Sequence, residues 1–236
     1  MYTAGLGLRG YRGGSTTRRW WAWTITVAGS LTAAIGVASV WFVISPAAAA
    51  PLTLPAAATA PAGQLGGTWT VAPGSVAGFR VRISAMGIGN DVVGRTPAVS
   101  GSVSMTRDWV VGARLRIALA GIRVDGKPQP QLAESLRTAR YPTALFSLTE
   151  VAAMGPEFAA GRTVTRQVHG FLTLDGTSCG VTVTITARRS GQALEVAGSM
   201  PVEFAYWGIQ PPPGAGILGS LADSGTAEFR LVLHRQ

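Results

Sequence analysis

The segment Val181-Thr182-Val183-Thr184-Ile185-Thr186 decides the fold class of this chain. Its apolar and polar side chains alternate strictly, and successive side chains of a β-strand point to opposite faces of the sheet. One face of such a strand is therefore apolar and the other is polar. Threonine on the polar face adds β-branching, which favours an extended backbone. The segment predicts a strand with one face in the protein core and the other in solvent.

The same alternation recurs in segments on both sides of this one, and glycine-containing breaks typical of hairpin turns and loops separate the segments. The apolar positions of these segments are Phe79, Val81, Ile83, Leu115, Ile117, Leu119, Ala144, Phe146, Leu148, Leu172, Leu174, Phe229, Leu231 and Leu233. The breaks lie at Gly87-Ile88-Gly89-Asn90, Gly121, Asp125-Gly126, Asp175-Gly176 and Ser190-Gly191.

One stretch departs from the two-residue period. Leu132 and Leu136 are four residues apart, with Glu134 between them and Arg137 after them, which predicts a short amphipathic helix within residues 130–140. Tyr141 precedes Pro142 and should end that helix, since the residue before a proline disfavours the helical backbone. Many short antiparallel strands with one short helix predict an all-β fold, either a sandwich or a closed barrel.

The N-terminal part carries a different pattern. Residues 20–44 contain neither a charge nor a proline, and as a helix they would reach roughly 37 Å, enough to cross the ~30 Å hydrocarbon core. Arginines in residues 1–19 place that end in the cytoplasm by the positive-inside rule. We expect a single-pass anchor at 20–44 with the remaining chain outside the cytoplasm. The alternative is a signal peptide cleaved within residues 47–50, which would release a secreted protein.

Residues 45–66 are mostly alanine, proline, threonine and glycine. Proline restricts the backbone and removes a hydrogen-bond donor, so this segment predicts an extended, semi-stiff linker. We expect it to hold the following domain, residues 67–236, away from the membrane surface.

Composition narrows the function classes. Charged residues make up 13% of the chain and apolar residues 47%, which excludes a disordered chain. The net charge of +9 could suggest nucleic-acid binding. However, part of that charge comes from arginines before the apolar run, and Lys127 is the only lysine. The arginine excess looks like a bias of the coding sequence, so we expect no nucleic-acid partner.

Residues that carry catalytic or metal chemistry are few. Cys179 is the only cysteine and has no basic neighbour in sequence, and Ser178-Cys179-Gly180 is interpreted as a turn. His169 is interpreted as a surface or structural residue. Aspartates near glycine breaks are interpreted as turn residues, namely Asp91, Asp108 and Asp125. We predict no catalytic residue, metal or cofactor. An enzyme acting on a lipid would need His169 or Cys179 buried beside an acid.

Four blocks after Gly67 carry a family resemblance. They are residues 69–75 with Phe79-Arg80-Val81-Arg82, residues 139–146 (ARYPTALF), residues 168–176 (VHGFLTLDG) and residues 205–209 (AYWGI). Their order and spacing resemble the YceI-like family of bacterial periplasmic or secreted proteins. The resemblance implies an eight-stranded antiparallel, lipocalin-like barrel that binds isoprenoid lipids such as polyprenyl phosphates or ubiquinone. It also implies a cytochrome b561-type membrane partner; whether the chain forms a homodimer stays open.

On this resemblance the apolar positions become a barrel lining that contacts an isoprenoid lipid or quinone. Each buried CH₂ group contributes about 0.8 kcal/mol, so a long tail needs few polar contacts. The alternative is a structural or interaction barrel whose interior is filled by these same side chains. The candidate lining is Phe79, Val81, Ile83, Leu115, Ile117, Leu119, Phe146, Leu148, Leu172, Leu174, Val181, Val183, Ile185, Trp207, Phe229 and Leu231.

The chain departs from the family pattern where a polar head group would bind. Phe204 and Tyr206 stand where members often have arginine and aspartate, and Cys179-Gly180 stands where they often have a basic residue and proline. The candidate site is therefore placed on the apolar wall. The arginines of the alternating segments are interpreted as a solvated outer face, namely Arg80, Arg82, Arg114 and Arg116.

Overall fold

The computed structural model describes residues 48–56, 59–85, 88–210 and 220–236. The anchor predicted at residues 20–44 and the basic segment before it lie outside these residues. Among the helices of the described residues, none is long and apolar enough to cross a membrane.

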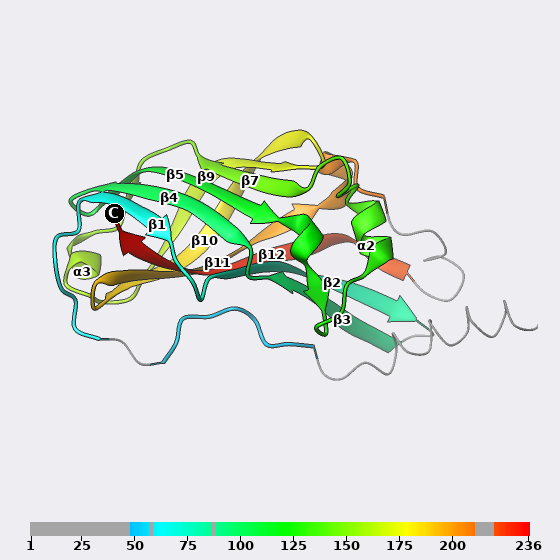
Figure 1. Cartoon of the computed structure of the whole chain (residues 1–236), viewed down its shortest axis with the longest axis horizontal. Helices are drawn as coiled ribbons and strands as arrows, with labels where there is room; N and C mark the ends of the chain where they lie inside the picture. Colours follow the sequence, from blue (N-terminus) through cyan, green and yellow to red (C-terminus); the bar gives the residue numbers. More distant parts are fainter. Residues whose placement is uncertain (1–47, 57–58, 86–87, 211–219) are drawn as a thin grey trace, which may run out of the picture. The chain divides into compact units, whose positions relative to one another are not determined.

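Eight antiparallel strands form a closed barrel (Figure 1). The barrel closes because the short first strand pairs with the fourth strand on one side and with the last strand on the other. The predicted all-β class and the eight-stranded barrel are confirmed. In order around the barrel the strands are β1 (Gly67–Val71), β4 (Val99–Thr106), β5 (Trp109–Ala118), β7 (Thr143–Leu148), β9 (Val164–Leu174), β10 (Thr177–Ser190), β11 (Ala193–Glu203) and β12 (Ser220–Arg235).

Strand β12 is longer than its barrel neighbour β1, and the part of β12 that extends beyond β1 pairs with a second group of strands. Its last residues pair with β1, whereas residues 220–230 pair with β2 (Val76–Ala85). β3 (Ile88–Thr96) and the two-residue β6 (Arg123–Val124) continue the sheet from there. The two-residue β8 (Ala152–Ala153) pairs with the start of β5.

Short helices lie toward opposite ends of the barrel. We call one end the α3 end, after α3 (Pro156–Ala159); it includes the β10–β11 turn and the last residues of β12. We call the other the α2 end, after α2 (Pro130–Ser135); it includes the β9–β10 turn and two 3₁₀ turns, η1 (Leu119–Gly121) and η2 (Phe204–Trp207).

Several predicted boundaries are wrong in detail. The predicted helix is real but ends at Ser135, and turns follow in which Arg137 has a φ of 44°. Leu119 begins η1 instead of ending a strand. Cys179 lies within β10 and not in a turn, because the β9–β10 turn uses only Asp175 and Gly176, with φ of 51° and 79°. Asp91, predicted as a turn residue next to the break at 87–90, lies within β3, since Ile88 already begins that strand.

Part of the predicted linker lies within the described residues. These residues, 48–56 and 59–64, which we call the strap, form hydrogen bonds with strands β2, β3 and β10. Arg80, Arg95, Arg188 and Arg189 donate to main-chain carbonyl oxygens of the strap. Arg82, Arg114 and Arg116 are exposed as predicted, whereas the Arg80 side chain is only 19% exposed.

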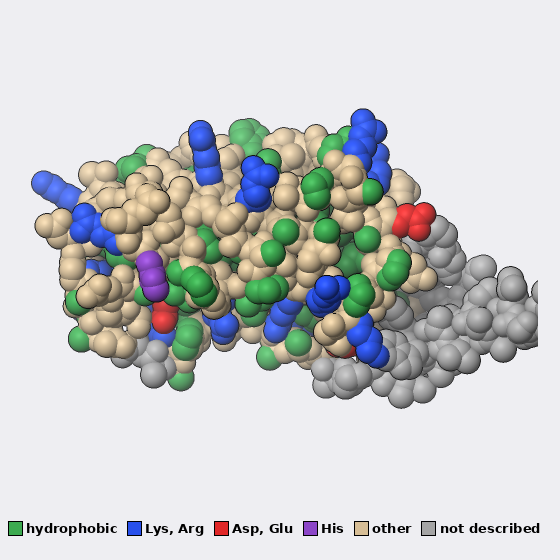
Figure 2. All heavy atoms as spheres, in the orientation of Figure 1, with side chains coloured by type: hydrophobic (Ala, Val, Ile, Leu, Met, Phe, Trp, Pro, Cys, Tyr) green, Lys and Arg blue, Asp and Glu red, His purple; other side chains and the backbone are tan. Residues whose placement is uncertain are grey.

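Basic side chains on the face shown in Figure 2 are spread over several strands and do not join into one stripe. That distribution differs from the clustered basic surface typical of nucleic-acid binding.

Candidate functional site

The strand register brings most of the predicted lining residues onto the inner face of the barrel. Directly paired residues share a face, so the pairs Leu115–Phe146 and Phe146–Leu172 carry one apolar row across three strands. The pairs Val196–Leu231 and Leu194–Leu233 carry another between β11 and β12. The two-residue alternation in the sequence thus becomes a continuous apolar interior.

The lining residues fall into two adjoining clusters. The main cluster contains six predicted residues that are buried and five packed against them in part: Phe146, Leu172, Val183, Ile185, Trp207 and Leu231, then Leu115, Leu148, Leu174, Val181 and Phe229. The second cluster, near the α2 end, forms around Leu119 with Phe79, Ile117 and Leu174 packed against its buried members. Val81 and Ile83, on β2, belong to neither cluster, although Val81 is buried.

The two ends of this interior differ in exposure. At the α3 end Trp69, Met154 and Phe158 are each only 2% exposed, and the Trp69 indole N–H donates to the carbonyl of Leu65 at 2.8 Å. At the α2 end Phe79 and Leu132 are only partly buried. Large buried side chains therefore fill the α3 end, whereas the α2 end combines buried residues, namely Leu119, Ile122 and Trp207, with the partly exposed Phe79 and Leu132.

Two glycines on the inner face of the barrel and a third on β3 each lie beneath a phenylalanine ring. A Cβ atom at Gly198 would lie 2.5 Å from Cζ of Phe229, and one at Gly170 would lie 2.5 Å from Cε2 of Phe146. A Cβ atom at Gly94 on β3 would likewise collide with the ring of Phe79 on the neighbouring strand β2. The rings therefore lie against the wall, in the space that a side chain would fill, and do not project straight into the barrel. These glycines cannot be identified from the sequence alone, because only the strand register reveals which ring each glycine faces.

A charged cluster joins α2 to the β9–β10 turn at the α2 end. The guanidinium of Arg137 donates to the Asp175 carboxylate through Nε at 2.7 Å and forms an ion pair through Nη2 at 2.6 Å. The Asp175 side chain is only 1% exposed, and its hydrogen bond raises the pKa of Arg137 above its ordinary value. The Tyr141 ring lies between this turn and two arginines, Arg137 and Arg140, at 5.4 and 5.3 Å from its centroid. These contacts fix the rim of the barrel.

The model of the YceI-like domain matches residues 69–233, more than two thirds of the chain. The chain belongs to the YceI-like family. None of the curated proteins is significantly similar to it in sequence.

Two solved structures are also similar to this YceI-like chain. A polyisoprenoid binding domain from Saccharophagus degradans, implicated in plant cell wall breakdown, has 17% sequence identity and a TM-score of 0.54, covering 72% of this chain and 98% of that chain. BcnA from Burkholderia cenocepacia has 20% identity and a TM-score of 0.49, covering 65% of this chain and 95% of that chain. At these identities the first likeness shows the fold alone.

In this YceI-like domain Trp207 lies in the interior, as expected of a lining residue, but no strand carries it. It lies in η2 and not on a strand, yet it is 2% exposed and belongs to the main cluster. Its indole N–H donates to the carbonyl of Leu172 on β9 at 3.1 Å. Trp207 therefore packs the segment after β11 onto the barrel interior.

Replacing Trp207 with phenylalanine should lower the free energy of unfolding by about 1–2 kcal/mol, because the hydrogen bond and part of the buried ring are lost. Trp109→Phe is the matched control, since Trp109 is 45% exposed on the outer face, and it should change stability by less than about 0.5 kcal/mol. Urea denaturation of both variants measures the change in the free energy of unfolding. Equal effects would show that Trp207 is not a packing anchor.

Residues considered for catalysis lie apart from one another in this YceI-like domain. His169 is exposed on the outer face of β9, where Nδ1 lies 3.1 Å from the Thr182 hydroxyl. Cys179 faces the main cluster, and its thiol donates to the carbonyl of Tyr206 at 3.4 Å. Within the described ranges no group of three or more His, Cys, Asp or Glu residues has the arrangement of a metal site.

Positions where the family often has charged residues are apolar or exposed here. Phe204 is partly buried against the main cluster, and Tyr206 is 67% exposed. The geometry therefore keeps the candidate site on the apolar wall and its rim at the α2 end.

Proposed function

We propose that this chain is an extracytoplasmic lipid-binding protein that holds or transports an isoprenoid quinone in its barrel. The observation that carries the proposal is the pair of inner glycines beneath Phe146 and Phe229, because rings that lie against the wall take up less of the space around the barrel axis, where a slender apolar chain would lie. Membership of the YceI-like family supports it, as does the fold shared with a polyisoprenoid binding domain.

Charge near the interior favours a neutral head group over a phosphate. At the α2 end the charge of Arg137 is compensated by Asp175. At the α3 end the buried Arg189 donates to the carbonyls of Ala159, Ala62 and Gly63. Both guanidinium groups already have acceptors, so a quinone ring at the α2 rim requires less rearrangement than an anionic phosphate does.

Tail length provides the direct test. One isoprene unit adds five carbons, and burial contributes about 0.8 kcal/mol for each CH₂ group. Lengthening a soluble quinone from one isoprene unit to two should therefore strengthen binding tenfold or more, measured as quenching of tryptophan fluorescence. Protein purified from its native membrane should also release a prenyl quinone on organic extraction, detected by mass spectrometry. Affinity that does not change with tail length would contradict the proposal.

The second candidate is a structural or interaction barrel that binds no lipid. Buried Trp69, Phe158 and Trp207 favour it, because these large side chains occupy interior space themselves. If the extract contains a polyprenyl phosphate and no quinone, the lipid-binding function is retained and only the proposed head group is wrong. If the protein is repeatedly empty after extraction and gives no quenching, the structural barrel is favoured.

The proposal places the barrel at a membrane through the N-terminal apolar run. The uncharged stretch at residues 20–44 and the arginines before it support a retained anchor with the domain outside the cytoplasm. A barrel held there lies close to the bilayer in which isoprenoid quinones dissolve.

A further inference from the structure

Buried side chains occupy the α2 end of the barrel, among them Leu119, Ile122 and Trp207. A lipid tail can pass this end only if part of it moves. Leu132 on α2 packs against the second cluster, which contains Leu119 and Ile122. Leu174 packs against both this cluster and the main cluster, so the two adjoin. The helix α2 therefore covers one end of the space assigned to the lipid.

The segment that carries α2, residues 129–141, forms few contacts with the rest of the domain. None of the six residues of the helix is fully buried, and no side chain caps its N-terminus. Among the described residues, the main-chain hydrogen bonds of this segment join its own members, as from the N–H of Thr138 to the carbonyl of Ala133 at 2.9 Å. The hydroxyl of Ser135 is buried and has no hydrogen-bond partner there. Such segments open locally more easily than strands of the core do.

An ion pair holds this α2 segment to the β9–β10 turn. Nη2 of Arg137 lies 2.6 Å from Oδ2 of Asp175. The Asp175 side chain is 1% exposed, whereas that of Arg137 is 52% exposed. Tyr141, at the end of the segment, lies against the same turn, since a Cβ atom at Gly176 would be 2.7 Å from its ring. A fixed carboxylate thus pairs with an arginine that can turn toward solvent.

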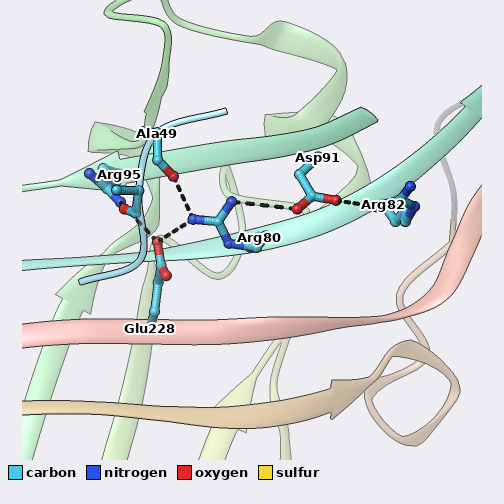
Figure 3. A network of polar contacts seen from close by, with 7 residues as sticks. Ala49, Arg80, Arg82, Asp91, Arg95 and Glu228 are labelled. Atoms are coloured by element: carbon cyan, nitrogen blue, oxygen red, sulfur yellow. Dashed lines mark hydrogen bonds and ion pairs between the residues drawn. The ribbon is translucent and has the colours of Figure 1, made fainter. Parts of the chain in front are cut away.

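The strap is held to the barrel at more points than the α2 segment is. Figure 3 shows Arg80 and Arg95 donating to its carbonyl groups beside the buried Glu228. Two further arginines, on β10, donate to it farther along the chain. The attachment of the α2 segment depends on the single ion pair and on the packing of Leu132 and Tyr141. Of these two covering segments, the α2 segment therefore moves at the lower cost.

We propose that the α2 segment is a lid that opens to let the isoprenoid lipid enter and leave the barrel, and that the Arg137–Asp175 ion pair is the latch that keeps it closed. The inference rests on the proposed function and adds the route of the lipid. Rotation at Gly126, where φ is 75° and a Cβ atom would meet nothing within 4 Å, provides a hinge before the lid. Opening uncovers Leu119 and Ile122.

Breaking the latch tests the lid. Asp175→Asn removes the charge and keeps the turn, because asparagine also adopts the positive φ of 51° found at this residue. Stopped-flow quenching of tryptophan fluorescence measures quinone binding to the full chain in detergent. Both association and dissociation should become severalfold faster with little change in Kd, since the closed lid is present with and without lipid. Hydrogen exchange of residues 129–141 should also become faster.

Arg140→Gln is the matched control for the latch. Arg140 lies over the same Tyr141 ring, 5.3 Å from its centroid, but forms no ion pair within the described part of the chain. Its replacement should leave the two rates and the hydrogen exchange of the lid unchanged.

A crosslink provides the locked state. Arg137→Cys and Thr177→Cys, combined with Cys179→Ser, remove the latch and place thiols at two exposed positions, one in the lid and one beside the β9–β10 turn. A short bismaleimide that joins them should slow association and dissociation below the rates of the unmodified chain. A monofunctional maleimide on the same variant should leave both rates fast.

The outcomes separate the lid from the lipid-binding function. If quinone binds at the same rates in the latched, unlatched and crosslinked states, the lid is wrong and the lipid-binding function is retained. The same holds if hydrogen exchange of the lid rises in Asp175→Asn but the rates do not. If the full chain binds no quinone in any state, the proposed function is wrong, and the lid with it.

Discussion

Gly198→Ala is expected to weaken isoprenoid binding about tenfold and to lower the free energy of unfolding by about 1–3 kcal/mol. The added methyl group would lie 2.5 Å from Cζ of Phe229 and 3.0 Å from the carbonyl oxygen of Thr184. The carbonyl belongs to a paired strand and cannot move far, so the ring must leave the wall and enter the space assigned to the lipid tail. Quinone titration and urea denaturation of the same preparation measure both effects.

Two further variants isolate the ring as the cause. Gly180→Ala on β10 is the matched glycine control, because a Cβ atom there meets only Phe171, at 3.9 Å, and neither binding nor stability should change. Combining Gly198→Ala with Phe229→Leu removes the colliding ring and should restore binding in part. If the double variant binds as weakly as Gly198→Ala alone, the glycine does not act by holding the ring against the wall.

Glu228→Gln is expected to lower the free energy of unfolding by about 2–3 kcal/mol and to loosen the strap. The carboxylate is nearly inaccessible to solvent, and its loss leaves Arg80 and Arg95 partly buried without their shared negative charge. The remaining carboxylate near them, Asp91, lies 3.6 Å from Arg80 and also pairs with Arg82. The two arginines should then turn toward water and release Ala49 and Ala50.

Thermal unfolding and limited proteolysis of the strap report these two effects separately. Glu203→Gln is the control, because Glu203 is exposed at the end of β11, and it should change stability by less than about 0.5 kcal/mol. A Glu228→Gln variant with unchanged stability and an equally protected strap would show that the buried carboxylate does not organise this face.

Much of the barrel lining is predictable from the sequence because alternation is a local property. A strand such as residues 181–186 places every second side chain on the same face whatever it pairs with, so Val183 and Leu172 are correctly assigned to the interior without knowledge of the register. Leu119 and Trp207 also lie in the interior, but on 3₁₀ turns, where the two-residue period does not apply.

The roles of the outer arginines were not predictable in the same way. Arg80 and Arg82 follow one alternating pattern in one strand, yet their side chains are 19% and 64% exposed. The difference arises because Glu228 and the carbonyl of Ala49 lie beside Arg80, and neither is near it in sequence. An ion pair between segments that are far apart in the chain produces no periodic pattern in the sequence.

By itself, the sequence determined that the chain after residue 67 is built of strands with one apolar face, and its four motifs pointed to the correct family. Only the tertiary structure decided that β1 closes the barrel between β4 and β12, that inner glycines hold phenylalanine rings against the wall, and that the presumed spacer is a strap. The physical reason is that side-chain alternation is set by the local backbone, whereas closure, ring placement and strap attachment depend on contacts between residues far apart in the chain.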